Sequence, residues 1–224
     1  MPLPPPSLSD SSIESTASDI VYQHIRNSIV TGALEENESI GQDSVARMFD
    51  ISKVPVREAL KRLEAEGLVS FQKNKGAIVT SISEPELADI FEVRAILESN
   101  AIRLAVSNMS AATIEEAKRH CEAFSQETDV ARWAELNWAF HLCLYKDANN
   151  DFLISQIQAI NDRIERYLRI QLSLSHGQPT ADQEHREILQ ACINGEAGRA
   201  AELVRQHIVG AHSSLKQEIS QAPK

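Results

Sequence analysis

Residues 45–69 read VARMFDISKVPVREALKRLEAEGLV, and this stretch predicts a helix, a tight turn and a second helix. Val56, Leu60 and Leu63 repeat at i, i+4 and i+7, which places one apolar stripe along the second helix. Gly67 follows as the helix end, because glycine takes the left-handed conformation without a steric penalty. A helix pair of this kind is typical of the helix-turn-helix, in which the second helix enters the major groove of DNA.

The outer face of the second helix is basic. Lys53, Arg57, Lys61 and Arg62 lie away from the apolar stripe, on the side where phosphates and base edges would lie. Ser52 stands immediately before the helix, and its hydroxyl can accept from an unpaired N–H of the first turn or bind a phosphate. We expect Ser52, Lys53, Arg57 and Lys61 to contact DNA, with Lys53 and Arg57 on bases or the phosphates near them.

Two short β-prone runs follow the helix pair. LVSF at residues 68–71 and AIVT at residues 77–80 flank a polar turn, which predicts a two-stranded wing. The tip of this wing consists of Lys73, Asn74, Lys75 and Gly76, all of which are DNA-binding candidates. Lysines at such a tip strengthen binding through phosphates and add little sequence selectivity.

The segments from Ser52 to Leu60 and from Arg62 to Val69 resemble the signature of the GntR superfamily of bacterial transcription regulators. The resemblance covers residues 16–80 and implies a winged helix-turn-helix, a two-fold dimer on a palindromic operator and a wing tip in the minor groove. Residues 36–40, ENESI, depart from the Pro-Gly turn that the family has upstream of its recognition helix. The geometry of this turn is therefore open.

The charge of the chain is unevenly distributed. The 224 residues carry a net charge of −10, which taken alone argues against DNA binding. Residues 51–80 nevertheless carry +3, whereas residues 16–50 carry −4 and residues 81–224 carry −7. Positive charge thus gathers on the second helix and the wing, and the acidic remainder should orient the encounter with DNA. A merely solvated helix face is the alternative, which the motif disfavours.

Composition also bears on location. No apolar run is long enough to span a bilayer, and residues 1–15 lack the basic and apolar regions of a signal peptide. Their Pro and Ser content predicts a disordered N-terminal arm. Cys121, Cys143 and Cys192 are scattered on apolar helical faces, so we expect buried thiols rather than disulfides or a zinc knuckle. A cytoplasmic protein without membrane contact is expected.

From residue 83 onward the pattern is helical. The expected helices occupy residues 83–108, 110–126, 129–147, 150–174, 180–194 and 196–219, with short connections that favour an antiparallel bundle. The predicted fold class is therefore mainly α. A winged helix-turn-helix at residues 16–80 is joined by a linker at residues 81–84 to an all-α antiparallel six-helix bundle at residues 85–219, for effector binding and dimerisation.

Histidines in the helical half suggest a site. His141 follows Asn137 by one helical turn, and His185 and His207 lie in the last two expected helices. Polar side chains that meet in a bundle core form metal or ligand sites. Asn137 and the three histidines could therefore hold a divalent transition ion such as zinc, nickel or manganese. Spacing alone leaves surface or satisfied core histidines as the more common alternative.

Residues 85–212 resemble the FCD ligand-binding domain of the FadR subfamily. The resemblance rests on VRAILE at 93–98, NWAFH at 137–141, EHREIL at 184–189 and AAELVRQH at 200–207. It implies that one Asp and three His hold a metal, with a small organic acid bound beside or onto it. Asn137 occupies the Asp position here and is a neutral, weaker donor. Arg94 could hold the effector carboxylate, and an intrahelical ion pair with Glu98 is the equal alternative.

The resulting hypothesis is a bacterial DNA-binding transcription regulator, expected to be a repressor, whose operator affinity is controlled by a small carboxylate effector. A metal-dependent enzyme on the helical bundle is one alternative, in which the metal activates water. It is disfavoured because no spacing marks a general base. An effector-independent DNA-binding protein is the other alternative. Sugar acids, dicarboxylates, hydroxy acids and amino-acid-like molecules all suit a pocket with a metal and an arginine.

Overall fold

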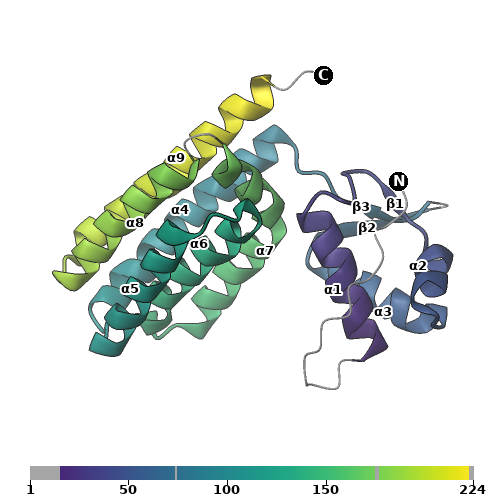
Figure 1. The fold of residues 1–224 in the computed structure, drawn as a ribbon, viewed down its shortest axis with the longest axis horizontal. Coiled ribbons are helices and arrows are strands. Elements are labelled where there is room, and N and C mark those ends of the chain that lie inside the picture. Colours follow the sequence, from purple (N-terminus) through teal and green to yellow (C-terminus); the bar gives the residue numbers. More distant parts are fainter. Residues whose placement is uncertain (1–15, 74, 175–176, 222–224) are drawn as a thin grey trace. The chain divides into compact units, whose positions relative to one another are not determined.

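The computed structural model describes residues 16–73, 75–174 and 177–221, and the chain forms two compact units (Figure 1). The first unit ends at Ile82 and the second begins at Ser83. Each unit contains hydrophobic core residues of its own, which is the mark of separate domains. The N-terminal arm expected at residues 1–15 lies outside the described residues.

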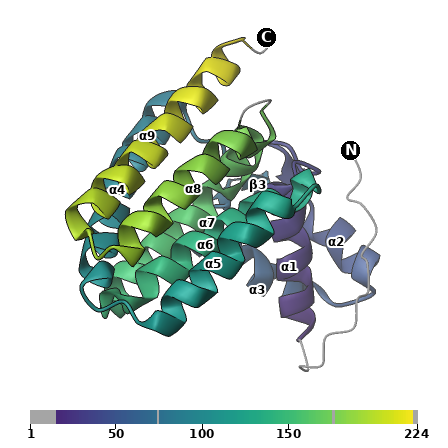
Figure 2. The ribbon, with the colours of Figure 1, turned by 60° about the vertical axis from the view of Figure 1, so that its left-hand side comes forward.

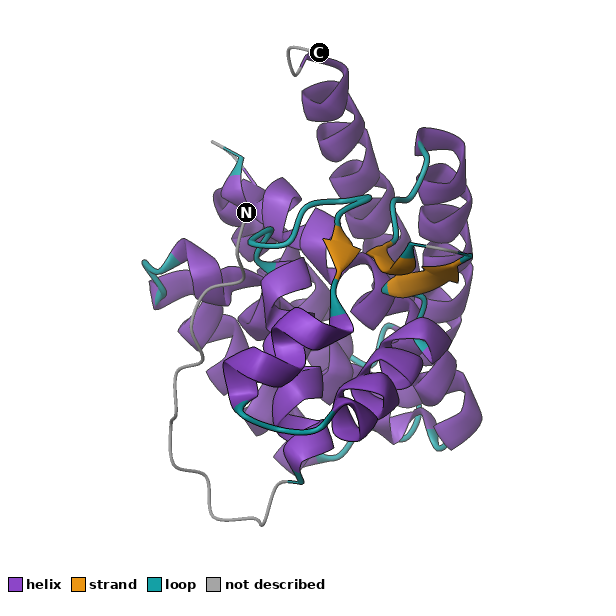
Figure 3. Ribbon diagram, turned by 90° about the vertical axis from the view of Figure 1, so that its right-hand side faces the viewer, coloured by secondary structure: helices purple, strands orange, loops and turns teal. Residues whose placement is uncertain are grey.

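The first unit combines three helices with a small sheet. Its elements are α1 (Ala17–Val30), β1 (Ser39–Ile40), α2 (Gln42–Phe49), α3 (Lys53–Ala65), β2 (Val69–Gln72) and β3 (Gly76–Val79). The strands pair antiparallel in the order β1-β3-β2 and are drawn in orange in Figure 3. Val56, Leu60 and Leu63 are buried in the core, as their spacing predicted. The predicted winged helix-turn-helix is confirmed.

Strand β1 was not predicted from the sequence, and Asn37 explains how the chain enters it. Asn37 has a positive φ of 64°, a conformation that glycine adopts freely and that asparagine tolerates better than most other residues. Asn37 N–H donates to the Val79 carbonyl at 3.0 Å, and Val79 N–H donates to the Glu38 carbonyl at 2.9 Å. The turn is therefore formed without the Pro-Gly pair.

The start of α3 differs from the prediction. Ser52 occupies the N-cap position with extended backbone, but its side chain makes no capping hydrogen bond. The prediction that its hydroxyl caps α3 is therefore wrong, and the exposed side chain remains open to water or a phosphate. At the other end Gly67 has a φ of 76°, and Leu68 N–H donates to the Leu63 carbonyl at 2.9 Å. This is the glycine-terminated helix end that the sequence predicted.

The second unit is a bundle of six α-helices within the described residues. They are α4 (Glu84–Val106), α5 (Ala111–Gln126), α6 (Val130–Tyr145), α7 (Asp151–Ser173), α8 (Gly177–Ile193) and α9 (Ala197–Gln221), with the 3-10 turn η1 (Lys146–Ala148) after α6. Figures 1 and 2 show the helices side by side, with α9 packed along α4 and α8. The predicted mainly α fold, with a helical bundle after the wing, is confirmed.

Capping residues mark the starts of α4 and α6, two of the helices that carry buried polar side chains. At α4 the Ser83 hydroxyl accepts from Glu86 N–H at 3.4 Å. At α6 the Asp129 carboxylate accepts from Ala131 N–H at 2.9 Å. Each cap satisfies a backbone donor that would otherwise be unpaired.

The structure bears on the three cysteines and on whether any helix could cross a membrane. Cys121, Cys143 and Cys192 are buried free thiols, as predicted. Burial raises the pKa of Cys192 to about 12, so this thiol stays protonated at neutral pH. Among the described residues, every helix falls short of the length and apolarity that crossing a membrane requires.

Candidate functional site

The exposed face of α3 carries predicted DNA-contacting residues. Lys53, Arg57 and Lys61 are exposed, whereas Leu60 on the opposite side is fully buried. The Lys53 ammonium pairs with the Asp43 carboxylate of α2 at 2.6 Å, and both side chains are mostly exposed. An ion pair this exposed adds little stability, so the lysine can exchange the carboxylate for a phosphate. The face is therefore accessible and basic.

Arg62, on the same helix, has a structural role instead. Its guanidinium donates to the Asp19 carboxylate at 2.6 Å and lies 4.1 Å from the centre of the Tyr22 ring. Both partners belong to α1. Arg62 therefore links α3 to α1 through an ion pair with Asp19 and a cation–π contact with Tyr22. This holds the helix that bears the exposed basic residues in place.

At the wing tip, Lys73 and Lys75 are exposed and Gly76 begins β3 with a φ of 77°. A side chain at Gly76 would meet no atom within 4 Å, so backbone conformation rather than space favours glycine there. Asn74, the fourth candidate of the tip, lies outside the described residues. The described tip residues thus present two ammonium groups on a sharp turn.

Three histidines meet inside the helical unit. His141 comes from α6, His185 from α8 and His207 from α9, and their exposed fractions are 2%, 0% and 7%. One ring nitrogen from each lies within 4.8 Å of the other two. The Nε2 atoms of His141 and His207 are 3.2 Å apart. The fold therefore brings together three residues that are 44 and 22 positions apart in the sequence.

His185 and Asn137 carry buried polar atoms without a hydrogen-bond partner among the described residues. These atoms are both ring nitrogens of His185 and Oδ1 of Asn137. Phe140 packs against the His185 ring with 4.4 Å between ring centres. An unpaired buried polar group costs about 1–3 kcal/mol, so several in one region call for a functional explanation. Asn137 precedes His141 by one helical turn, which puts both on one face of α6.

Burial keeps two of these imidazoles neutral. It lowers the pKa of His141 well below the ordinary value of 6.5, and the nearby rings of His207 and His185 lower it further. Burial, followed by the effect of His207, likewise lowers the pKa of His185. A neutral imidazole has a lone pair on one nitrogen, and this is the form that binds metal ions. The site is therefore suited to a cation.

Arg94, expected to hold an effector carboxylate, is paired with Glu98. Arg94 Nε donates to Glu98 Oε1 at 2.8 Å, and the two side chains are only 6% and 1% exposed. The Tyr145 hydroxyl donates to Glu98 Oε2 at 3.0 Å. Burial raises the pKa of Tyr145 well above 10, and the charge of Glu98 adds to this effect. The intrahelical ion pair is therefore formed, and it leaves the terminal amino groups of Arg94 outside it.

Two residues that the sequence analysis gave no role complete this histidine cluster. The Tyr145 hydroxyl lies 3.2 Å from His141 Nδ1, and Glu184 Oε2 lies 2.7 Å from His207 Nδ1. Tyr145 follows His141 by four positions, so helical spacing could have found it. Glu184 is adjacent in sequence to His185 but contacts a histidine of the next helix, which no spacing rule predicts.

A second group of potential metal ligands, Glu116, His120 and Cys143, is less suited to a metal. His120 Nε2 lies 3.8 Å from Glu116 Oε1, but the other carboxylate oxygen is paired with the Lys146 ammonium. Burial raises the pKa of Cys143 to about 11, so it remains a thiol rather than the thiolate that metals bind. The Lys146 ammonium already supplies the positive charge that the Glu116 carboxylate would otherwise take from a metal ion.

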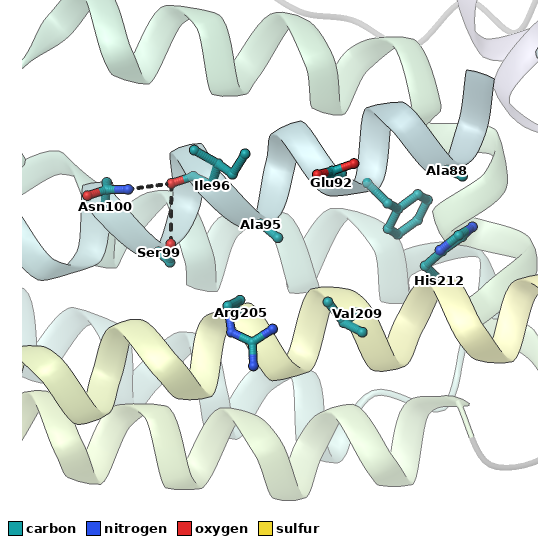
Figure 4. Close-up of a pocket in the computed structure, with 10 residues that line it drawn as sticks. Ala88, Glu92, Ala95, Ile96, Ser99, Asn100, Arg205, Val209 and His212 are labelled. Carbon is teal, nitrogen blue, oxygen red and sulfur yellow. Dashed lines mark hydrogen bonds between the residues drawn. The ribbon is translucent and has the colours of Figure 1, made fainter. Parts of the chain in front are cut away.

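A groove of about 490 Å³ lies between α4 and α9, and the three histidines do not line it. Its lining residues are Ala88, Phe91, Glu92, Ala95, Ile96, Ser99, Asn100, Arg205, Val209 and His212. Figure 4 shows Glu92 and Ile96 on α4, and Arg205 and Val209 on α9, on opposite sides. Ile96 and Val209 are 55% and 45% exposed. The groove therefore combines exposed apolar groups with both signs of charge.

Comparison with known families identifies both units. "Bacterial regulatory proteins, gntR family" matches residues 17–79, and "FCD domain" matches residues 89–210, more than half of the chain. The chain belongs to the GntR family. Its second unit is an FCD domain, and the combination makes it an effector-binding, DNA-binding transcription regulator.

Relatives of this GntR regulator resemble it over most of their length. The HTH-type transcriptional repressor GlaR of Escherichia coli K12 is 28% identical over 84% of this chain and 90% of its own. The Nta operon transcriptional regulator of Aminobacter aminovorans is 28% identical over 76% and 81%. Among solved structures, E. coli McbR/YncC has a TM-score of 0.76 at 21% identity, covering 91% of this chain and 99% of its own. At that identity the likeness shows a shared fold.

These findings decide between the alternatives drawn from the sequence. The GntR family and the relatives are transcription regulators and not enzymes, which sets aside the metal-dependent enzyme. The FCD match favours an effector-controlled regulator over an effector-independent DNA-binding protein.

Proposed function

We propose that this GntR regulator is a homodimeric repressor of a palindromic operator, controlled by a small carboxylate effector that binds at a divalent metal in the FCD unit. The observation that carries the metal proposal is the convergence of three buried imidazoles, from His141, His185 and His207. Imidazole nitrogens are ligands for zinc and nickel, and the amide oxygen of Asn137 would add the kind of donor that manganese prefers. The FCD match supports the effector.

The donor atoms fit such an ion in two respects. Two nitrogens bound at about 2.0–2.1 Å to one tetrahedral zinc lie about 3.3 Å apart. The Nε2 atoms of His141 and His207 are separated by 3.2 Å. In addition, a cation would give a partner to a nitrogen of His185 and to Oδ1 of Asn137, which are buried and unpaired among the described residues.

Asn137 would change the charge of the site. Its amide oxygen is neutral, and the three imidazoles are neutral when they bind a metal. A site in which these four neutral groups hold a divalent ion has a net charge of about +2. A carboxylate in place of Asn137 would lower that net charge to about +1. We propose that the substitution weakens metal binding but strengthens the attraction for an anionic effector. The bound ion supplies a Lewis-acid position for a carboxylate oxygen.

Arg94 is proposed as the second anchor of the effector. Its charge is already balanced by Glu98, so a carboxylate gains little from charge alone at this position. The terminal amino groups can still donate while Nε stays bound to Glu98. This arrangement favours effectors that chelate the metal and use Arg94 for orientation, such as hydroxy acids and dicarboxylates.

The groove between α4 and α9 is proposed as the seam of the homodimer. In a two-fold contact the same patch meets its own copy, so the patch must be complementary to itself. Glu92 and Arg205 supply opposite charges on the two walls, and the exposed side chains of Ile96 and Val209 supply apolar area. Sedimentation of an Ile96→Glu variant tests this seam: the monomer should increase, and an unchanged dimer would contradict it.

For DNA binding we propose Ser52, Lys53, Arg57, Lys61, Lys73, Lys75 and Gly76 as contacts, and Asn74 joins them from sequence alone. The exposure of the described side chains and the net positive charge of residues 51–80 support this set. Repression is supported by relatives that are named repressors. One is GlaR, and another is the gluconate operon repressor of Bacillus subtilis, 35% identical over 38% of this chain.

Metal content per chain tests the metal site. It should be measured by mass spectrometry on protein purified without a histidine tag or chelator. Near-stoichiometric metal that is lost in a His141→Ala/His207→Ala variant is the expected result. No metal, even after incubation with zinc, nickel and manganese, would overturn the site and leave Arg94 with hydrogen bonds as the effector's anchors.

The effector is tested separately by titrating operator binding in gel shifts with a panel of sugar acids, hydroxy acids and dicarboxylates. At least one acid should weaken the complex by roughly 5–150-fold, the usual range of allosteric coupling. Insensitivity to every acid in the panel would instead favour effector-independent binding.

A further inference from the structure

A chain of buried hydrogen bonds runs from α4 to the histidine cluster. Arg94 Nε donates to one oxygen of Glu98, and the Tyr145 hydroxyl donates to the other at 3.0 Å. All three side chains are buried. Because the Tyr145 hydroxyl is the donor to Glu98, the single hydrogen of the phenol is committed to that carboxylate.

This commitment determines which nitrogen of His141 carries hydrogen. The Tyr145 oxygen lies 3.2 Å from His141 Nδ1. Since its own hydrogen points to Glu98, the phenol can interact with His141 only as an acceptor. His141 must therefore donate from Nδ1, and in the neutral ring this leaves a lone pair on Nε2.

His207 is fixed in the same way by a different partner. Its Nδ1 lies 2.7 Å from Glu184 Oε2, and a carboxylate accepts, so this nitrogen also carries hydrogen. In the neutral form of His207, which is the form that binds metal, the Nε2 atoms of His141 and His207 face each other at 3.2 Å with lone pairs on both. Two lone pairs at this distance repel each other unless a cation lies between them.

We propose that Tyr145, held by Glu98, and Glu184 are positioning residues that lock His141 and His207 in their Nδ1–H tautomers. Both rings then present Nε2 to one divalent cation. The inference rests on the metal site proposed above and assigns residues that orient its ligands. Outer hydrogen-bond partners of this kind fix the ring orientation of ligating histidines and raise their basicity.

The experiment is zinc affinity by competition with a chromophoric chelator, together with the visible spectrum of the Co²⁺-substituted full-length protein. Tyr145→Phe removes the acceptor for His141, and Glu184→Ala removes the acceptor for His207. Each should weaken zinc binding by about 10–100-fold and alter the Co²⁺ bands. Glu184→Gln should retain part of the affinity, because its amide oxygen can still accept from Nδ1–H.

Thr113→Val is the matched control, since it deletes another buried hydroxyl, one bonded to Asp147 at 2.7 Å instead of to the cluster. It should bind zinc as the wild type does. Glu184 is only partly buried, so its variants remain informative if Tyr145→Phe is poorly folded. Wild-type affinity and spectrum in Glu184→Ala would overturn the positioning role alone. Failure of the wild type itself to bind zinc or Co²⁺ would overturn the metal site and with it this inference.

Discussion

Glu98→Gln is the substitution whose effect follows most directly from the structure. Glu98 balances the buried charge of Arg94 and accepts from Tyr145. The glutamine keeps the shape of the side chain and an oxygen that can accept one of these bonds, but it removes the negative charge. Arg94 is then a buried cation without a counter-ion, which is the costly product of breaking a buried ion pair.

The expected magnitude is large for one substitution. Breaking a buried pair costs about 3–5 kcal/mol, and we expect about 3 kcal/mol because the glutamine oxygen still accepts a hydrogen bond. With a urea dependence of about 2 kcal/mol per molar, the unfolding midpoint should fall by about 1.5 M. Arg94→Met/Glu98→Gln should recover most of this loss, since it removes the unpaired buried cation while the glutamine oxygen still accepts from Tyr145.

Tryptophan fluorescence provides the assay. The chain has two tryptophans, Trp133 and Trp138, and both lie on α6. Their fluorescence therefore reports unfolding of the helical unit alone, which avoids the mixed transitions expected of a two-domain chain.

A matched exposed pair provides the control for this prediction. Glu115 and Lys118 are paired at 2.6 Å with side chains 61% and 48% exposed. Glu115→Gln should leave the midpoint essentially unchanged because water screens this pair. A Glu98→Gln midpoint equal to that of the wild type would refute the reasoning. So would a double variant as unstable as the single one.

Three further predictions concern other parts of the chain. Arg57→Ala should weaken operator binding in a gel shift and, for a phosphate contact, lower the salt slope by about 1; full affinity at moderate salt would contradict the assignment. Asn37→Val should destabilise the first unit by about 1–2 kcal/mol, measured by hydrogen exchange at the amides of α1 and α3, because φ is 64° there, whereas Asn37→Gly should be tolerated. Iodoacetamide at pH 8 should modify Cys121, Cys143 and Cys192 slowly in the native protein, because all three are buried, and completely in urea; rapid native labelling by mass spectrometry would argue against this burial.

Most of the fold could be predicted because apolar periodicity and caps are local signals. The stripe of Val56, Leu60 and Leu63 and the end at Gly67 identified α3 without any tertiary information. Strand β1 could not be predicted in this way. It has two residues and exists through its pairing with β3, where Ser39 lies opposite Ile78. A strand this short has no periodicity of its own.

The meeting of the three histidines was predicted in outline, with help from the family resemblance. Helical spacing places Asn137 and His141 on one face, but the meeting of His185 with them depends on how α8 packs. The partner of Arg94 was undecided from sequence, since an i+4 carboxylate and an external ligand satisfy a guanidinium equally well. Glu184 was missed because its contact with His207 crosses from one helix to the next.

Helix α4 serves both the histidine cluster and the groove. Its buried face carries Arg94 and Glu98, and another face presents Glu92 and Ile96 to α9. An effector that shifts α4 would change both places together. If a second copy occupies the groove, effector binding and dimerisation are linked. The factor by which the effector changes the dimerisation constant then equals the factor by which dimerisation changes the affinity for the effector. The concentration of the regulator itself would then help to set the amount of effector to which it responds.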